Sequence, residues 1–185
     1  MRVNLLAKRY AQALFDLSLE MKIQDKVEKD MQLIGEVLHD HRELRKLLKN
    51  PVIDNFKKIK LLNSIFEKHI QNITTRFFTL IISKNREMYI EPICEAYINI
   101  YKKYNNILTL EVTTAYKVNK AIKDILSKKV AEATNMNIEL HENIDEDLIG
   151  GFLINYEYYQ FDASIKTQLV ELQREFSKNL YIKKL

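Results

Sequence analysis

Histidine and cysteine, the side chains that most often bind metals or act as nucleophiles, are few and widely spaced in this chain. The histidines are His39, His41, His69 and His141, and none has the His-Glu-x-x-His spacing that puts two zinc ligands on one helix face. Cys94 is the only cysteine, so the chain can form neither an intramolecular disulfide nor a cysteine-rich metal site. We therefore predict surface histidines, a buried thiol, and no metal or other cofactor.

Carboxylates form one contiguous run, Asp145-Glu146-Asp147. Such a run at a turn more often caps a helix than supplies a general acid and a general base. The Gly150-Gly151 pair that follows lacks the spaced glycines and the lysine of a phosphate-binding loop. The sequence predicts no catalytic residues. A small hydrolase built on the carboxy-terminal part remains an alternative, although no nucleophile lies in a pattern with a base.

Composition indicates a folded protein of the aqueous phase. The 185 residues are 46% hydrophobic and 29% charged, with a net charge of +4. Basic residues alternate with acids, as in Lys26-Val27-Glu28-Lys29-Asp30, which is typical of a solvated helix face. A helical nucleic-acid-binding protein stays as the second alternative, although such binders usually cluster their basic residues. The chain shows neither a secretory signal nor a membrane-spanning run, so we expect no direct membrane insertion.

The first 105 residues have the apolar period of helices. One stripe on the first helix joins Leu6, Tyr10, Ala13, Leu14 and Leu17, and a second helix repeats apolar residues from Val27 to Leu38. Further helices are predicted over 42–49, from a cap at Asp54, over 73–84 and over 88–104. The segment 73–84 is apolar on nearly every side, which predicts a central position. Six helices with short connections predict a bundle.

After Asn105-Asn106 the apolar period changes to two. Residues 108–116 alternate apolar and polar side chains, as in a strand with one face on a core. A helix capped by Asn119, a short strand near Leu140, a strand over 152–156 and a last helix follow. Asp162 or Ser164 is expected to cap that last helix. The sequence thus predicts a mainly α chain, with a helical bundle over 1–105 and a small α/β domain over 106–185.

The adjacent glycines have a structural explanation of their own. Glycine serves where the backbone needs a positive φ or where another element approaches closely. We expect Asp145 to begin a short helical turn, Gly150 to end it and Gly151 to start the next strand. A β-branched residue at Gly150 should then be poorly tolerated.

With these residues laid out, the chain resembles the delta subunit of the bacterial ATP synthase, a family that includes the mitochondrial oligomycin-sensitivity-conferring protein. The family signature surrounds the glycine pair, with Asp162-Ala163-Ser164 as its usual sequel. Its matching residues are Ile138, Leu140, Ile144, Asp145, Leu148, Gly150, Gly151, Phe152, Ile154, Asn155 and Glu157. One departure is the Tyr156-to-Tyr159 turn, where relatives often carry a glycine.

Three earlier segments are also similar to this family. The run Ala7 to Phe15 looks like its opening helix, and Asn50-Pro51-Val52-Ile53 with Lys58 looks like the junction of its third and fourth helices. Asn85-Arg86, followed by Ile93, Ala96 and Tyr97, looks like the junction of its fifth and sixth helices. The resemblance therefore covers nearly the whole chain.

The resemblance implies a stator subunit without catalysis of its own. In this family the helical bundle receives the amino-terminal helices of the α subunits, and the carboxy-terminal domain meets the b subunits of the peripheral stalk. The resemblance thus implies that the protein keeps the catalytic head from turning with the rotor, and we expect it at the cytoplasmic face of the bacterial inner membrane. The α-subunit site of the family carries over to the first and fifth helices, at Tyr10, Ala13, Leu14, Phe77 and Ile81. No b-subunit residues are assigned beyond those after Asn106.

Overall fold

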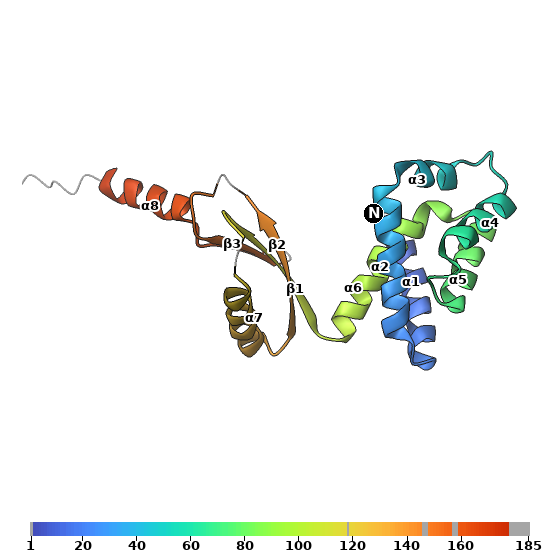
Figure 1. The fold of residues 1–185 in the computed structure, drawn as a ribbon, viewed down its shortest axis with the longest axis horizontal. Helices are drawn as coiled ribbons and strands as arrows, with labels where there is room; N and C mark the ends of the chain where they lie inside the picture. The colour runs from blue at the N-terminus through green and yellow to red at the C-terminus, as the bar shows by residue number, and fades with distance from the viewer. Residues whose placement is uncertain (1, 118, 146–147, 157–158, 178–185) are drawn as a thin grey trace, which may run out of the picture. The chain divides into compact units, whose positions relative to one another are not determined.

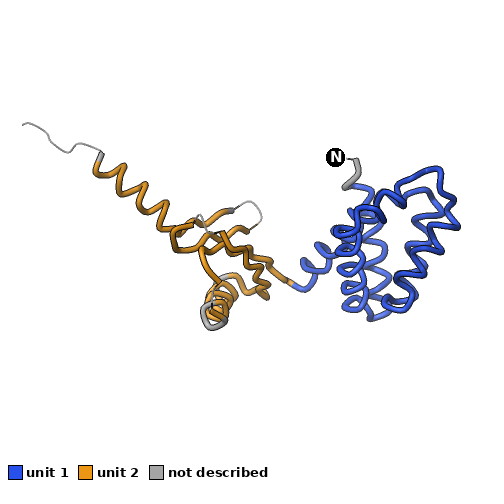
Figure 2. Tube along the Cα trace, turned by 45° about the horizontal axis from the view of Figure 1, so that its top comes forward, with its two compact units in different colours: residues 1–105 blue, residues 106–185 orange. Residues whose placement is uncertain are grey.

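The chain forms two compact units, residues 1–105 and residues 106–185 (Figure 2). The computed structural model describes the whole chain except residues 1, 118, 146–147, 157–158 and 178–185. The division between the units lies where the apolar period changes from that of a helix to that of a strand. The prediction of a mainly helical chain with a small carboxy-terminal sheet is confirmed (Figure 1).

Helices make up the first unit within the described residues. They are α1 (Arg2–Glu20), α2 (Gln24–Asp40), α3 (Arg42–Lys49), α4 (Asn55–Phe66), α5 (Asn72–Ser83), a short 3₁₀ turn η1 (Glu87–Tyr89) and α6 (Ile90–Tyr104). The apolar stripe predicted on the second helix lies inside the unit: Val27, Met31, Ile34 and Leu38 are all buried.

Helix α6 packs more extensively than any other helix of the first unit. It packs against both α1 and α2 and buries Ile90, Ile93, Cys94 and Tyr97. The sequence predicted a central position for the segment 73–84, and that prediction is wrong. That segment is α5, which packs mainly on α4 and turns one side outward, so that Leu80 is 48% exposed. An outer helix that is apolar on nearly every side has apolar surface left for a partner.

Aspartate caps the start of one helix in this chain, and asparagines follow the ends of three others. The predicted cap at Asp54 is confirmed, because its carboxylate accepts a hydrogen bond of 3.1 Å from the backbone N–H of Phe56. Asn85, Asn106 and Asn135 follow α5, α6 and α7 (Lys120–Thr134) with φ between 51° and 55°. Asparagine tolerates this left-handed conformation better than most residues, which explains why each of these helices ends there.

The second unit contains a four-stranded mixed sheet of order β2-β1-β3-β4. Its elements are β1 (Ile107–Thr114), α7 (Lys120–Thr134), β2 (Asn137–Ile144), β3 (Phe152–Tyr156), β4 (Tyr159–Asp162) and α8 (Ile165–Ser177). β1 pairs in parallel with β2 and antiparallel with β3. The predicted alternation is confirmed along β1, where Leu108, Leu110, Val112 and Thr114 are buried. The turn between β3 and β4 includes residues 157–158, which lie outside the described residues.

The two helices of the second unit begin differently. Asn119 precedes α7, but its side chain makes no capping hydrogen bond, so that predicted cap is wrong. At the start of α8, both predicted capping residues, Asp162 and Ser164, accept hydrogen bonds. Ser164 Oγ accepts from the backbone N–H of Thr167 at 3.2 Å, and Asp162 accepts from the Ser164 N–H and from the Thr167 hydroxyl at 2.8 Å each. These bonds hold the Asp162 carboxylate ionised and lower its pKa.

Candidate partner-binding site

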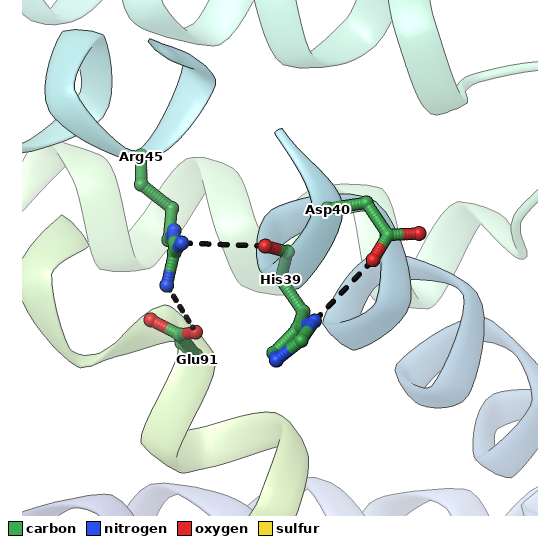
Figure 3. Close-up of polar contacts among 4 residues, drawn as sticks. All are labelled: His39, Asp40, Arg45 and Glu91. Atoms are coloured by element: carbon green, nitrogen blue, oxygen red, sulfur yellow. Dashed lines mark hydrogen bonds and ion pairs between the residues drawn. The ribbon is translucent and has the colours of Figure 1, made fainter. Parts of the chain in front are cut away.

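The side chains with possible catalytic chemistry lie apart or act structurally. His39, at the end of α2 (Figure 3), is exposed, and so is His41, which follows the helix. Close to them, Arg45 of α3 donates to the His39 carbonyl oxygen and pairs with Glu91 of α6, both at 3.2 Å. These contacts tie α3 to its neighbours. Within the described residues, no three His, Cys, Asp or Glu side chains lie close enough to share a metal ion.

Cys94 and the acidic run offer no reactive group in the described part of the chain. Burial raises the pKa of the Cys94 thiol, which keeps it protonated and unreactive. Asp145 is exposed, and its backbone carbonyl accepts a hydrogen bond from the Leu148 N–H. Glu146 and Asp147 lie outside the described residues.

Helix α1 buries a side that lies next to the apolar stripe named in the sequence analysis and shares only Leu14 with it. Its buried residues are Ala7, Ala11, Leu14, Phe15 and Ser18, which is a stripe displaced by about one residue from the predicted one. Consequently Tyr10 is half-buried, and Ala13 and Leu17 are exposed. Ser18 fixes the rotation of the helix, because its hydroxyl shares a hydrogen bond of 2.8 Å with the hydroxyl of buried Tyr97 on α6.

Helix α5 has the same division into an inner and an outer side. Phe78, Ile81 and Ile82 are buried, whereas Phe77 is half-buried and Leu80 is exposed. Asp30 of α2 holds the start of this helix: its carboxylate accepts from the Thr74 hydroxyl at 2.6 Å and from the Gln71 N–H at 2.8 Å. α5 is therefore fixed in rotation by a buried polar contact, as α1 is.

The outer sides of α1 and α5 meet at an aromatic pair. The rings of Tyr10 and Phe77 are edge to face, with centroids 6.4 Å apart. We call this surface the α1–α5 face. Its residues are Leu6, Tyr10, Ala13 and Leu17 of α1 and Ile73, Phe77 and Leu80 of α5, all of them half-buried or exposed.

The five residues carried over from the family fall into two groups. Tyr10, Ala13 and Phe77 lie on the α1–α5 face and are accessible. Leu14 and Ile81 lie directly beneath, at 2% and 0% exposure, and belong to the core of the unit. In this structure they support the face and offer no contact surface themselves.

Arg86 belongs to the α1–α5 face although the sequence predicted no role for it. It follows α5 and lies at the edge of the face. Its guanidinium donates a hydrogen bond to the Tyr10 hydroxyl, and the guanidinium carbon lies 5.5 Å from the centroid of the Tyr10 ring. The Asn85-Arg86 pair marked the end of a helix in the sequence, but nothing in the sequence indicated the contact with Tyr10.

The second unit also exposes apolar surface. Helix α8 carries Leu169 (52% exposed), Leu172 (47%) and Phe176 (84%) along one side. Next to the start of this helix, a cavity of about 520 Å³ lies between the sheet and α7, lined by Val112, Leu126, Leu140 and Phe152 among others. Ile165 N–H donates to the Gly150 carbonyl at the cavity rim, so the glycine pair positions α8 there.

No helix in the described residues is long and apolar enough to cross a membrane. Exposed apolar side chains lie on two surfaces, the α1–α5 face and the α8 side.

Comparison with known proteins identifies the family. The family model described as "ATP synthase delta (OSCP) subunit" matches residues 6–176. The ATP synthase subunit delta of Parabacteroides distasonis is 31% identical, over 97% of this chain and 99% of its own length. The subunit delta of Christiangramia forsetii is 32% identical over the full length of both chains. The chloroplastic subunit delta of Trieres chinensis is 33% identical, over 98% of this chain and all of its own.

The fold agrees with a solved structure. A chain of the mitochondrial ATP synthase hexamer of Toxoplasma gondii superposes with a TM-score of 0.71, covering 95% of this chain and 99% of that one, at 19% identity. The alternative of a nucleic-acid-binding protein finds no support in these comparisons. The chain therefore belongs to the ATP synthase delta (OSCP) subunit family, and it is a non-catalytic peripheral-stalk subunit of that enzyme.

Proposed function

We propose that the chain links the catalytic head of a proton-translocating F-type ATP synthase to its peripheral stalk through two docking surfaces. Residues 1–105, as a six-helix bundle, receive an amino-terminal helix of an α subunit on the α1–α5 face. Residues 106–185 meet the b subunits. The chain works as one copy in this assembly, at the cytoplasmic face of a bacterial inner membrane. Held at both ends, it keeps the head from rotating with the central rotor.

The observation that carries the α-subunit site is the outward apolar side shared by α1 and α5. An amphipathic helix inserts its apolar side between two such helices, with anchors spaced three or four residues apart. Ala13 is small enough to allow close approach of a partner backbone. Tyr10 and Phe77 provide rigid aromatic area beside it.

The energy of this contact is moderate. Removing on the order of 400 Å² of apolar surface from water contributes about 10 kcal/mol gross, at about 25 cal/mol per Å². Association costs about 4 to 15 kcal/mol in lost freedom. A single site is therefore marginal, and firm attachment of the head needs the second surface.

The apolar side of α8 is the surface that we assign to the b subunits. Three large apolar residues, Leu169, Leu172 and Phe176, are spaced three and four positions apart along one side of this helix. In water this side is unfavourable, and packing against a helix of the stalk covers it. Leu172→Asp should abolish retention on immobilised b subunit, while Lys166→Asp, on the same helix, leaves retention intact.

Calorimetric titration tests the α-subunit site. The probe is a synthetic peptide of about 25 residues from the amino terminus of the α subunit of the same ATP synthase. We expect one-to-one binding that Tyr10→Ala weakens at least about tenfold, since a buried aromatic anchor is lost. Tyr116→Ala is the matched control, because Tyr116 is 78% exposed in the second unit. No binding by the folded wild type would overturn the proposal.

A further inference from the structure

Arg86 lies at the edge of the α1–α5 face with most of its hydrogen-bonding capacity unused. One nitrogen donates to the Tyr10 hydroxyl. A guanidinium has five N–H donors and is always charged. In the part of the chain that the structure describes, no carboxylate lies within ion-pair distance of Arg86, whereas Lys58, Arg45 and Lys123 each have one.

The turn that carries Arg86 is held on both sides. Asn85 has φ 54°, and the N–H groups of Asn85 and Arg86 donate to the carbonyls of Ile82 and Ile81 at the end of α5. Asn55 of α4 donates to the Asn85 side chain at 2.8 Å. On the other side Glu87 forms an ion pair with Lys58, which is 1% exposed. The backbone at Arg86 is therefore held in place, and the bond to the Tyr10 hydroxyl orients the guanidinium before any partner arrives.

Fixed position favours recognition by charge. A guanidinium that is preorganised loses little conformational entropy when it binds a carboxylate, and the two groups can form two parallel hydrogen bonds. The half-buried position of Arg86 beside an apolar face weakens screening by salt, so such a pair contributes more than one on an open surface.

We propose that Arg86 is the charged anchor of the α1–α5 face, and that it pairs with a carboxylate side chain of the docked helix. Through its bond to Tyr10 it also positions that ring. This inference rests on the proposed function, and it adds a requirement on the partner: an amphipathic helix with an acidic residue where its apolar side meets Arg86.

The test uses the full chain and the α-subunit peptide. Arg86→Gln should weaken binding about tenfold and reduce its salt dependence. The affinity of Arg86→Lys should lie between those of the wild type and Arg86→Gln, since lysine keeps the charge but lacks the planar guanidinium that can form two parallel hydrogen bonds. Lys8→Gln is the matched control: it removes one positive charge from α1 on the side that faces α6, and it should leave the affinity unchanged. Melting curves confirm that each variant is folded.

A set of peptides identifies the acidic residue. Each Asp or Glu of the peptide is replaced in turn by Asn or Gln. One replacement should weaken binding to the wild type about tenfold and have no further effect on Arg86→Gln, which is the signature of a coupled pair. Equal affinities of Arg86→Gln and wild type, or no coupled peptide residue, would overturn this inference alone. Failure of the wild type to bind any peptide would overturn the proposed function as well.

Discussion

A Cβ atom at Gly151 would lie 2.3 Å from the carbonyl oxygen of Ala163 and 2.9 Å from the Cα of Ser164. Both are backbone atoms at the start of α8, which cannot move without displacing the helix. Gly151 also has φ +81°, where other residues are strained. At Gly150 the nearest atom is the end of the Ile165 side chain, at 2.7 Å, and a side chain can rotate away. The requirement for glycine is thus strongest at Gly151.

Gly151→Ala should therefore destabilise the second unit by about 2 kcal/mol or more, from the positive φ and the backbone collision. Gly150→Ala should cost less than about 1 kcal/mol. Urea unfolding of the two full-length variants, followed by circular dichroism, measures both. Equal losses would contradict this ranking of the two glycines. A β-branched residue at Gly150, which the sequence analysis expected to be harmful, remains worse than alanine there because it cannot avoid Ile165.

The stability of the first unit should depend on pH through the carboxyl group of Asp30. Burial raises the pKa of its carboxyl above the ordinary value of 3.8, although the hydrogen bonds from Thr74 and Gln71 oppose the shift. Between the ordinary and the raised pKa, the folded state binds more protons than the unfolded state. Stability contributed by this group is therefore present at low pH and is lost as the pH rises through the raised pKa.

Asp30→Asn removes this titration. We expect the free energy of unfolding of the wild type, minus that of the variant, to fall as the pH rises from about 3 to about 6. Lost hydrogen bonds should make the variant less stable at every pH, so the slope is the informative quantity. Urea unfolding at several pH values measures it. A difference that rises with pH would mean that the carboxyl is better stabilised in its ionised form.

Side-chain contacts between residues far apart in the sequence could not be predicted from the sequence pattern. Spacing along the sequence indicates which side chains share a helix face, but Arg86 meets Tyr10 across 76 positions and Asp30 meets Thr74 across 44. Lys58 was read as a family marker, and nothing indicated that it is buried against Glu87. Such pairs depend on how helices pack, which local patterns do not specify.

At the scale of the element, α1 shows both what periodicity predicts and where it fails. The helix itself was predictable because apolar residues recur every three or four positions. The side that it buries was not, because α1 has two apolar stripes. Residues 6, 10, 13 and 17 form one of them, but the core takes residues 7, 11, 14, 15 and 18, where alanine and serine allow α6 to approach closely. Leu6, Tyr10 and Leu17 remain half-buried or exposed.

The same substitution at two alanines distinguishes these sides. Ala11→Leu inserts a larger side chain where the wild-type residue is 0% exposed, and it should cost about 1 to 3 kcal/mol. Ala13→Leu, on the exposed side, should change stability by less than about 0.5 kcal/mol. Thermal unfolding of both variants measures this. Comparable losses would mean that the side with Ala13 is packed as closely as the side with Ala11.

Strands were predictable from a period of two, and their pairing was not. Each of the strands near residues 108, 140 and 152 stood out by local alternation or by its flanking turn. The order β2-β1-β3-β4 depends on which edges meet, and the parallel pairing of β1 with β2 needs the intervening α7 to cross the sheet. The sequence of a single strand specifies neither the strand order nor the direction of pairing.

At the scale of the whole molecule, each of the two units has exposed apolar side chains of its own, which we propose as separate docking surfaces. The helical unit has its own buried core, made of residues between Ala7 and Tyr97. The sheet unit has a second one, and the chain passes between them at Asn105-Asn106. In the proposed assembly each surface alone is marginal, so we expect retention to depend on linkage: once one surface is bound, the other is at an effective concentration of about the millimolar range.

If linkage holds, a fragment of residues 1–105 should bind the α-subunit peptide as well as the full chain does, but it should compete poorly with the full chain for the assembled enzyme. Because this fragment keeps the whole core of the first unit, it should unfold cooperatively and bind the α-subunit peptide with the affinity of the full chain. It should nevertheless displace the labelled full chain from the assembled ATP synthase only at an excess of about 100-fold or more, since it lacks the second attachment. The fragment with Tyr10→Ala is the control and should not displace it. Displacement by the fragment at equal concentration would mean that the helical unit alone carries the attachment.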